Sequence, residues 1–154
     1  MNTAGPDLAH EAAAASRLVA FFEAFGPGDL DQLARHYTED ARFKDPFNEV
    51  QGLAALRAVY AHMFEQLVAP RFEVHETLLG RDACALTWTF HFASRGAPGR
   101  PMRIRGASHL RLADDGRIAE HRDYWDAAEE LYEKQPVLGM LLHWLRRRIA
   151  APAA

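Results

Sequence analysis

The stretch that decides the arrangement of the chain is residues 36–52, HYTEDARFKDPFNEVQG, in which one carboxylate lies between two aromatic residues. Phe43, Asp45 and Phe47 are two residues apart, and side chains with that spacing share a face in an extended segment. Two phenyl rings on this face predict that it looks inward. A carboxylate held there loses hydration and becomes a better proton acceptor near neutral pH. The alternative interpretation is that Asp45 only caps the turn at Pro46.

The segments on either side of this stretch have helical periodicity. Leu18, Phe21, Phe22 and Phe25 follow the i, i+3, i+4, i+7 spacing of an amphipathic helix, which is predicted to start near residue 8 and to end at Gly26-Pro27-Gly28. Further helices are predicted over residues 29–37 and 53–68, with a short extended piece over residues 41–45 between them and Pro70 ending the last helix.

The pattern changes to strands after residue 70. Residues 83–94 are rich in Trp, Thr and Phe, and residues 102–112 alternate between apolar and basic positions, as in a strand with one wet face. Residues 96–101 are predicted to be a flexible connection, and residues 114–116, Asp-Asp-Gly, a hairpin turn before a returning strand over residues 117–125. Helices followed by strands indicate an α+β fold, whose curved sheet would leave an apolar cavity suited to a small molecule.

Composition indicates a single globular domain and excludes several function classes. The 154 residues are 49% hydrophobic and 25% charged, with a net charge of -3, which argues against nucleic-acid binding. The one cysteine, Cys84, excludes an internal disulfide, and no Cys/His spacing predicts a metal site. The start of the chain lacks a signal-peptide pattern, and no apolar run reaches the ~20 residues that span a bilayer, so a cytoplasmic location is expected.

The last predicted strand carries a second set of candidate groups. Alternation places His121, Asp123 and Trp125 on one face, where a His and an Asp two residues apart can share a proton. The alternative is that Asp123 pairs with Arg105 or Arg111 at a wet rim. On the long central strand the bulky side chains are the expected cavity face: Leu86, Trp88, Phe90 and Phe92, which leaves Thr87, Thr89 and His91 facing outward.

The order of these motifs resembles that of a known family. A helix, GDLDQL, HYTEDARFKDP, a loop to glycine, a helix, strands, DDGRI and RDYWD are similar to the nuclear transport factor 2-like superfamily, in particular its SnoaL-like and ketosteroid isomerase-like branch, over residues 15–126. The resemblance implies a conical α+β barrel of mostly antiparallel strands packed against three N-terminal helices, and a homodimer through the outer face of the sheet. The chain would divide into a leader, 1–7, a domain, 8–126, and a helical extension, 127–154.

The resemblance to ketosteroid isomerases implies roles for individual residues. Asp45 lies where these enzymes keep their general base, and Tyr60 matches a tyrosine that supports their oxyanion site. Their two oxyanion donors correspond to Phe21 and Ser108 here. Phe21 cannot donate a hydrogen bond and Ser108 donates weakly, so steroid isomerisation of the standard kind is not expected.

Two other relatives direct attention to Asp123, in RDYWD. It falls at the position of a catalytic aspartate of limonene-epoxide hydrolase, which also needs an Arg and a second Asp on the central strand, where this chain has Thr89-Phe90-His91-Phe92. Epoxide hydrolysis is therefore a distant alternative. Polyketide cyclases of the SnoaL type use an aspartate as acid or base on a similar closing strand, and Asp123 can serve that chemistry.

We therefore expect a small-molecule pocket protein without cofactor or metal. It would be either an acid–base enzyme (isomerase, cyclase or dehydratase) on an apolar substrate or a non-catalytic binding or accessory protein. Asp45 is the expected base, with Asp123 or His121 as second proton carrier and Tyr60 as hydrogen-bond donor. The expected ligand-binding residues are Phe21, Phe43, Phe47, Met63, Phe64, Trp88, Phe90, Ser108, Leu110 and Trp125.

The C-terminal segment is predicted to form two more helices, over residues 127–134 and 137–149, separated by Pro136. The second has an apolar stripe and ends in Arg146-Arg147-Arg148, where cations oppose the helix macrodipole. It would pack on its own domain or on a second subunit. Contact with a membrane surface as a basic amphipathic helix is the less favoured alternative.

Overall fold

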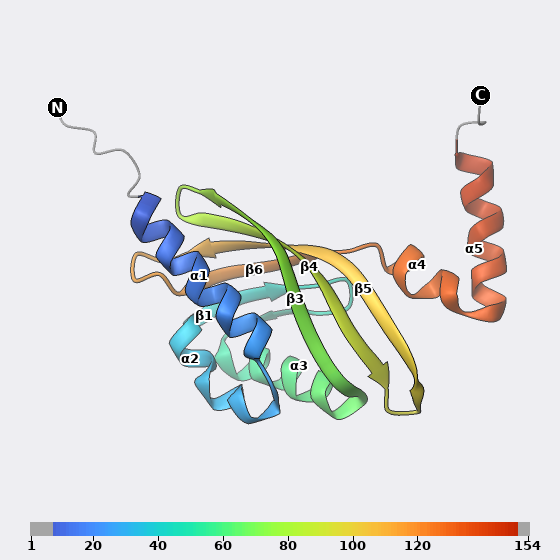
Figure 1. The fold of residues 1–154 in the computed structure, drawn as a ribbon, viewed down its shortest axis with the longest axis horizontal. Helices are drawn as coiled ribbons and strands as arrows, with labels where there is room; N and C mark the ends of the chain where they lie inside the picture. The colour runs from blue at the N-terminus through green and yellow to red at the C-terminus, as the bar shows by residue number, and fades with distance from the viewer. Residues whose placement is uncertain (1–7, 151–154) are drawn as a thin grey trace.

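The computed structural model describes residues 8–150, so the expected leader, 1–7, lies outside the described residues. Within them, six strands form one sheet in the order β2-β1-β6-β5-β4-β3, antiparallel throughout except for the parallel pair β1–β6 (Figure 1). The α+β cone is confirmed, but the sheet is not closed into a barrel, because β2 and β3 remain its two edges. The strands are β1 (Tyr37–Lys44), β2 (Glu49–Gln51), β3 (Leu67–Gly80), β4 (Ala83–Ser94), β5 (Ala97–Leu112) and β6 (Ile118–Tyr124).

The expected N-terminal helices pack against this sheet. They are α1 (Leu8–Ala24), a 3-10 turn η1 (Pro27–Gln32) that leads into α2 (Leu33–His36), and α3 (Leu53–Gln66). Helix α1 packs on β3, and α3 packs on β1, β2 and β3. Their apolar faces join the strands in one core, in which Leu56, Leu86 and Leu110 are almost completely buried.

Two segments that were not expected to be strand, the helix end before Pro70 and the connection over residues 96–101, are strand in the structure. Helix α3 ends at Gln66, and β3 begins at once and continues through Pro70, where pairing with β4 is interrupted between Val68 and Arg71. Proline has no N–H to donate, and β3 tolerates it as an edge strand. The expected flexible connection over residues 96–101 is also wrong, because β5 starts at Ala97 after a tight turn and so continues the pairing with β4. The turn at Gly116 is confirmed, with φ at 79°.

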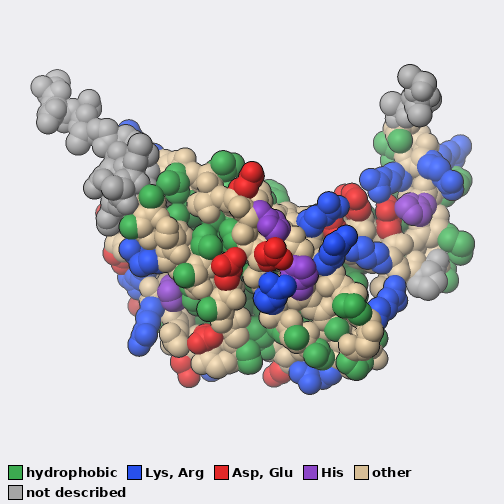
Figure 2. Space-filling view, viewed as in Figure 1, with side chains coloured by type: hydrophobic (Ala, Val, Ile, Leu, Met, Phe, Trp, Pro, Cys, Tyr) green, Lys and Arg blue, Asp and Glu red, His purple; other side chains and the backbone are tan. Residues whose placement is uncertain are grey.

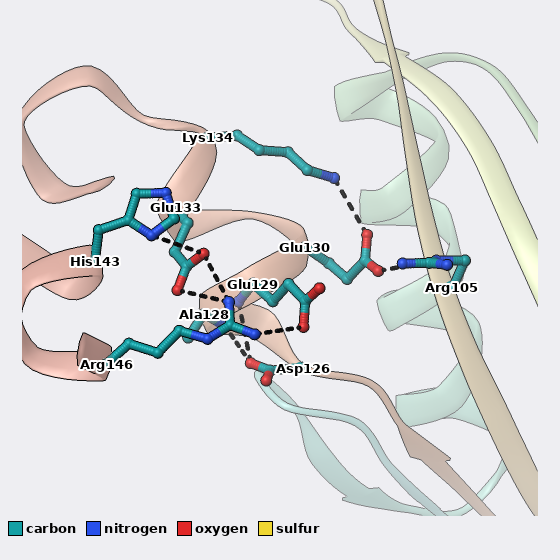
Figure 3. A network of polar contacts seen from close by, with 9 residues as sticks. All are labelled: Arg105, Asp126, Ala128, Glu129, Glu130, Glu133, Lys134, His143 and Arg146. Atoms are coloured by element: carbon teal, nitrogen blue, oxygen red, sulfur yellow. Dashed lines mark hydrogen bonds and ion pairs between the residues drawn. The ribbon is translucent and has the colours of Figure 1, made fainter. Parts of the chain in front are cut away.

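The C-terminal segment forms a separate arm. After α4 (Ala127–Glu130) and a 3-10 turn η2 (Tyr132–Lys134), α5 (Pro136–Ile149) stands apart from the sheet (Figure 1). Ion pairs on the polar side of α5 connect it to the segment before it. Arg146 pairs with Glu133 at 3.1 Å and with Glu129 at 3.5 Å, and His143 also pairs with Glu133 (Figure 3). The helix therefore packs on η2 rather than on the sheet, and its apolar side chains are exposed.

In the described part of the chain, no helix is long and apolar enough to cross a membrane.

Candidate functional site

A cavity of about 830 Å³ lies between α3 and the sheet. Every strand contributes to its wall, together with α1, α3, the loop after β1 and residues near η2. The wall is mainly apolar and aromatic, and its polar groups are few, as is typical of a small-molecule site. The aromatic residues of the wall are Phe22, Phe43, Phe47, Tyr60, Phe72, Trp88, Phe90, Phe92 and Trp125.

All four residues expected to carry chemistry line this one cavity: Asp45, Tyr60, His121 and Asp123. Most of the expected ligand-binding residues also line it, namely Phe43, Phe47, Met63, Trp88, Phe90, Ser108 and Trp125. The remaining three, Phe21, Phe64 and Leu110, are core residues that are not on the wall. Phe21 stacks on His36, with ring centroids 3.8 Å apart, and Phe64 packs on Phe25.

A buried chain of hydrogen bonds connects two points of the cavity wall. The hydroxyl of Tyr60 lies 3.0 Å from that of Tyr37, which lies 2.7 Å from Nδ1 of His121. Nε2 of His121 lies 2.8 Å from Oδ1 of Asp123. Tyr37 and His121 are 0% and 4% exposed, so this chain is shielded from water except through its two ends, Tyr60 and Asp123.

A second chain of donors reaches Asp123 from the other side. Nε1 of Trp88, which can only donate, gives its hydrogen bond to Oγ of Ser108 at 2.8 Å. Ser108 in turn donates to Oδ1 of Asp123 at 2.5 Å. Two donors thus converge on Oδ1, an arrangement that suits a carboxylate. Among the described residues, none donates to Oδ2, which is left for a molecule in the cavity.

The direction of hydrogen-bond donation along the first chain follows from its last contact, the one between His121 and Asp123. A lone pair on Nε2 of His121 would be repelled by Oδ1 at 2.8 Å, so we assign the imidazole proton to Nε2. Nδ1 then accepts from Tyr37, and Tyr37 accepts from Tyr60. Burial raises the pKa of Tyr37 well above its ordinary value, and burial followed by the negative charge of Asp123 raises that of Tyr60. Both phenols therefore keep their protons.

Asp45 is held quite differently, by its own loop. Its Oδ1 accepts from the backbone N–H groups of Phe47 at 2.7 Å and Asn48 at 2.6 Å, and the side-chain amide of Asn48 reaches both carboxylate oxygens. The turn-cap interpretation of Asp45 is therefore confirmed. Strand β1 ends at Lys44, so the expected single extended face is interrupted. Phe43 is 4% exposed, whereas Phe47 is 55% exposed and packs on Trp125.

The outer face of the sheet carries the polar groups that were expected to point away from the cavity. His91 pairs with Glu73 at 2.9 Å, and Thr89 bonds His75 at 2.8 Å. Figure 2 shows histidine, acidic and basic side chains gathered over β3, β4 and β5. The alternative pairing of Asp123 with Arg105 or Arg111 is wrong, because Arg105 pairs with Glu130 at 3.4 Å and, among the described residues, no ion pair joins Arg111 to Asp123.

Several residues of the site were not predicted from the sequence, and three of them matter most here. Tyr37 was expected only as the last residue of the predicted second helix, yet it is the hydrogen-bond partner of His121. Phe22 and Phe72 line the cavity, where Phe21 had been expected. A buried tyrosine needs a partner for its hydroxyl, and this requirement was the available signal for Tyr37. Nothing in the helical spacing distinguishes Phe22 from Phe21.

Comparison with protein families found one match, the SnoaL-like domain, over residues 18–121. A search of the curated proteins found no significant match.

Solved structures with the same fold are numerous. A Mycobacterium tuberculosis LEH-like epoxide hydrolase is 16% identical, with a TM-score of 0.67 over 92% of this chain and 99% of that one. AclR, a putative hydroxylase from Streptomyces galilaeus, is 22% identical, with a TM-score of 0.65 over 87% and 98%. A ketosteroid isomerase-like protein from Catenulispora acidiphila, in complex with trimethylamine, is 16% identical, with a TM-score of 0.63 over 82% and 90%. At these identities the likeness concerns the fold alone.

Proposed function

The chain belongs to the SnoaL-like domain family, and we propose that it binds an apolar small molecule in its cavity and moves a proton on it without a cofactor. The observation that carries this proposal is the asymmetry of Asp123. Its Oδ1 is held by Ser108 and His121, its Oδ2 receives no hydrogen bond from the described residues, and Asp123 is one of the residues that line the cavity. A fixed carboxylate with one available oxygen suits a general base.

The neighbours of Asp123 have supporting roles in this proposal. Ser108 and His121 orient the carboxylate, and Tyr37 fixes the tautomer of His121 by donating to its Nδ1. A proton taken up at Oδ2 would lie beside the mainly apolar wall of the cavity and next to the molecule that gave it, which favours its return to the same molecule. Isomerisation, cyclisation and dehydration all consist of such transfers.

We assign the base to Asp123 rather than to Asp45. The donors on Asp45 are the backbone of its own loop and the neighbouring Asn48, and they satisfy both of its oxygens. With both oxygens occupied in this way, Asp45 presents no free carboxylate oxygen to a substrate. Asp45 would then shape the cavity through its loop and contribute negative charge.

The same cavity also supports a non-catalytic binding or accessory role, in which the hydrogen bonds on both aspartates serve the fold alone. Epoxide hydrolysis has less support. The cavity side of β4 carries Trp88 and Phe90 rather than an arginine and a second aspartate.

Binding and turnover are tested in two steps. The fluorescence of N-phenyl-1-naphthylamine, a neutral apolar dye, reports occupancy of the cavity. Ala55 lines the cavity and Ala54, its neighbour on α3, is exposed and does not. We expect Ala55→Trp to reduce dye binding and Ala54→Trp to leave it unchanged. Equal binding by both variants would contradict a ligand cavity at this position.

Turnover requires a substrate, which native mass spectrometry of the purified protein can supply if a small molecule is retained. Compounds of that class are then screened for conversion by the wild type, Asp123→Asn and Asp45→Asn. Loss of conversion in Asp123→Asn alone supports the assigned base. Binding without conversion by any of the three proteins supports the non-catalytic role.

A further inference from the structure

We propose that the molecule taken up by this cavity is an apolar amine, bound as its ammonium cation with the charged nitrogen at Oδ2 of Asp123. This inference rests on the proposed function, in that it requires the cavity to be a small-molecule site, and it adds the chemical class of the ligand.

The first argument is the charge of the wall. Two aspartates, Asp45 and Asp123, line the cavity, and within the described residues no lysine or arginine does. The two acids lie next to each other, because Lys44 pairs with Arg122 across the parallel strands β1 and β6 and each aspartate follows by one residue. A carboxylate in an apolar site is costly without a partner of opposite charge.

Basic side chains lie close to this point, but on the other side of the wall. Lys44 and Arg122 line a shallow hollow on the surface, which the two aspartates also border. Lys44 is paired with Glu49, and the guanidinium of Arg122 lies 4.8 Å above the ring of Tyr124. Neither of them lines the cavity. His121, which contacts Asp123 at 2.8 Å, is assigned as a neutral imidazole, so a cationic ligand would supply the positive charge that this wall lacks.

The second argument is that the donors at the buried end of the cavity are already used. The indole N–H of Trp88 is given to Ser108, and the hydroxyl of Ser108 to Asp123. In the assigned direction of the buried chain, Tyr60 donates to Tyr37, Tyr37 donates to His121, and His121 donates to Asp123. Asp123 and Tyr60 therefore both present acceptor oxygens to the cavity. A carbonyl or anionic group would find no free donor there, whereas an ammonium group donates to both.

The third argument is the aromatic surroundings. Phe22 and Phe43 contact the ring of His121 edge-on, at 5.5 and 5.0 Å between centroids, and Trp88 lies beside Ser108. These three residues and Trp125 line the same cavity as Asp123, so aromatic rings are available to a ligand bound there. Aromatic faces attract cations, most strongly where water is excluded. The apolar part of an amine would occupy the remaining volume.

Three compounds with one carbon skeleton test the charge preference. They are N,N-dimethyl-3-phenylpropylamine, which is a cation at neutral pH, the uncharged N,N-dimethyl-3-phenylpropanamide, and the anion 4-phenylbutyrate. Each competes with N-phenyl-1-naphthylamine for the wild-type protein. We expect the amine to compete at about tenfold lower concentration than the amide, as one buried charge contact gives, and the carboxylate to compete most weakly.

Two variants, each of which removes one negative charge, test whether Asp123 is the source of the preference for the amine. Asp123→Asn removes the carboxylate of the cavity, and Asp31→Asn removes an exposed one that pairs with Arg57 on the surface. We expect the amine and the amide to compete equally in Asp123→Asn, and the tenfold preference to persist in Asp31→Asn. If Asp123→Asn fails to fold, the wild-type series still decides the charge preference.

The possible failures are distinguishable. If the amide or the carboxylate competes as well as the amine in the wild type, the ligand class is wrong while the cavity remains a binding site. If the dye itself does not bind, or binds regardless of Ala55→Trp, the proposed function fails, and this inference fails with it.

Discussion

Asp45 follows strand β1 and Asp123 lies on the neighbouring strand β6, yet the protein holds these two aspartates by opposite means. The donors to Asp45 come from two and three residues further along the chain. The donors to Asp123 are Ser108 on β5 and His121 on β6, and behind them stand Trp88 on β4 and Tyr37 on β1. The hydrogen bonds to Asp45 come from a single turn, whereas those that support Asp123 come from four strands.

This difference separates structural from chemical use of a carboxylate. A local turn that occupies both oxygens gives a stable loop and leaves little for a ligand. Support from several strands fixes one oxygen and leaves the other available, at the cost of burying polar groups that must all be paired. The two aspartates should therefore respond differently to mutation, and the following predictions begin with the largest effect.

Loss of the proposed base, Asp123, should separate the two aspartates most clearly. Asp123→Asn removes the available carboxylate oxygen, and we expect kcat/KM to fall by about a hundredfold or more, the usual contribution of a general base. Asp45→Asn keeps an oxygen that can accept from the loop backbone, and we expect a fall of less than about threefold. Steady-state kinetics on the identified substrate measure both. Equal losses would remove the distinction between the two residues.

The second prediction disturbs Asp123 from a distance. A Cβ at position 106 would lie 2.5 Å from Cη2 of Trp88 and 3.0 Å from Cβ of Trp125, so Gly106→Ala must displace Trp88 from Ser108. We expect a loss of about 2–3 kcal/mol in the free energy of unfolding, measured in urea. Gly99→Ala, on the same strand, is the control, because nothing lies within 4 Å of its added Cβ. A similar loss in both variants would show that Trp88 is not confined as described.

The third prediction concerns the phenol behind His121. Tyr37→Phe leaves Nδ1 of His121 without its donor, and we expect a loss of about 1–2 kcal/mol in the free energy of unfolding at neutral pH.

The pH dependence of this loss has a defined sign. The folded protein raises the pKa of Tyr37, chiefly through burial, so only the unfolded chain ionises at the ordinary tyrosine pKa of about 10. The wild type should lose stability as the pH rises above that value, and its advantage over Tyr37→Phe should shrink. Urea unfolding at several alkaline pH values measures the gap. A gap that stays constant would contradict burial of this phenol.

The smallest effect is expected at the loop. Asp45→Ala removes the acceptor of two backbone N–H groups, and we expect a loss of about 1 kcal/mol in the free energy of unfolding. Asp45→Asn should cost less than about 0.5 kcal/mol, since its amide oxygen can still cap the turn. Thermal unfolding compares the two variants. A larger loss than that of Tyr37→Phe would mean that the loop, rather than the buried chain, stabilises this end of the cavity.

Much of the architecture could be read from local patterns. The periodicity around Phe22 and Phe25 indicated a helix, alternation after residue 102 indicated a half-buried strand, and Gly116 indicated a hairpin turn. The face that carries His121 and Asp123 followed from a period of two. The length of the turn after β4 could not be predicted from local patterns. Strand pairing continues into residues that are rich in glycine and proline, a composition typical of loops.

The sequence by itself determined the family, the α+β order and the inward face of the closing strand, because each depends on residues close together in the chain. For Asp45 it left two alternatives, a base and a turn cap. Only the tertiary structure decided that Phe22 rather than Phe21 lines the cavity, that Tyr37 donates to His121, and that Asp123 keeps one oxygen available. These features depend on which strands are neighbours and on how far each side chain reaches across them. Hydrogen-bond geometry of that kind arises from packing between distant segments, which a one-dimensional pattern does not contain.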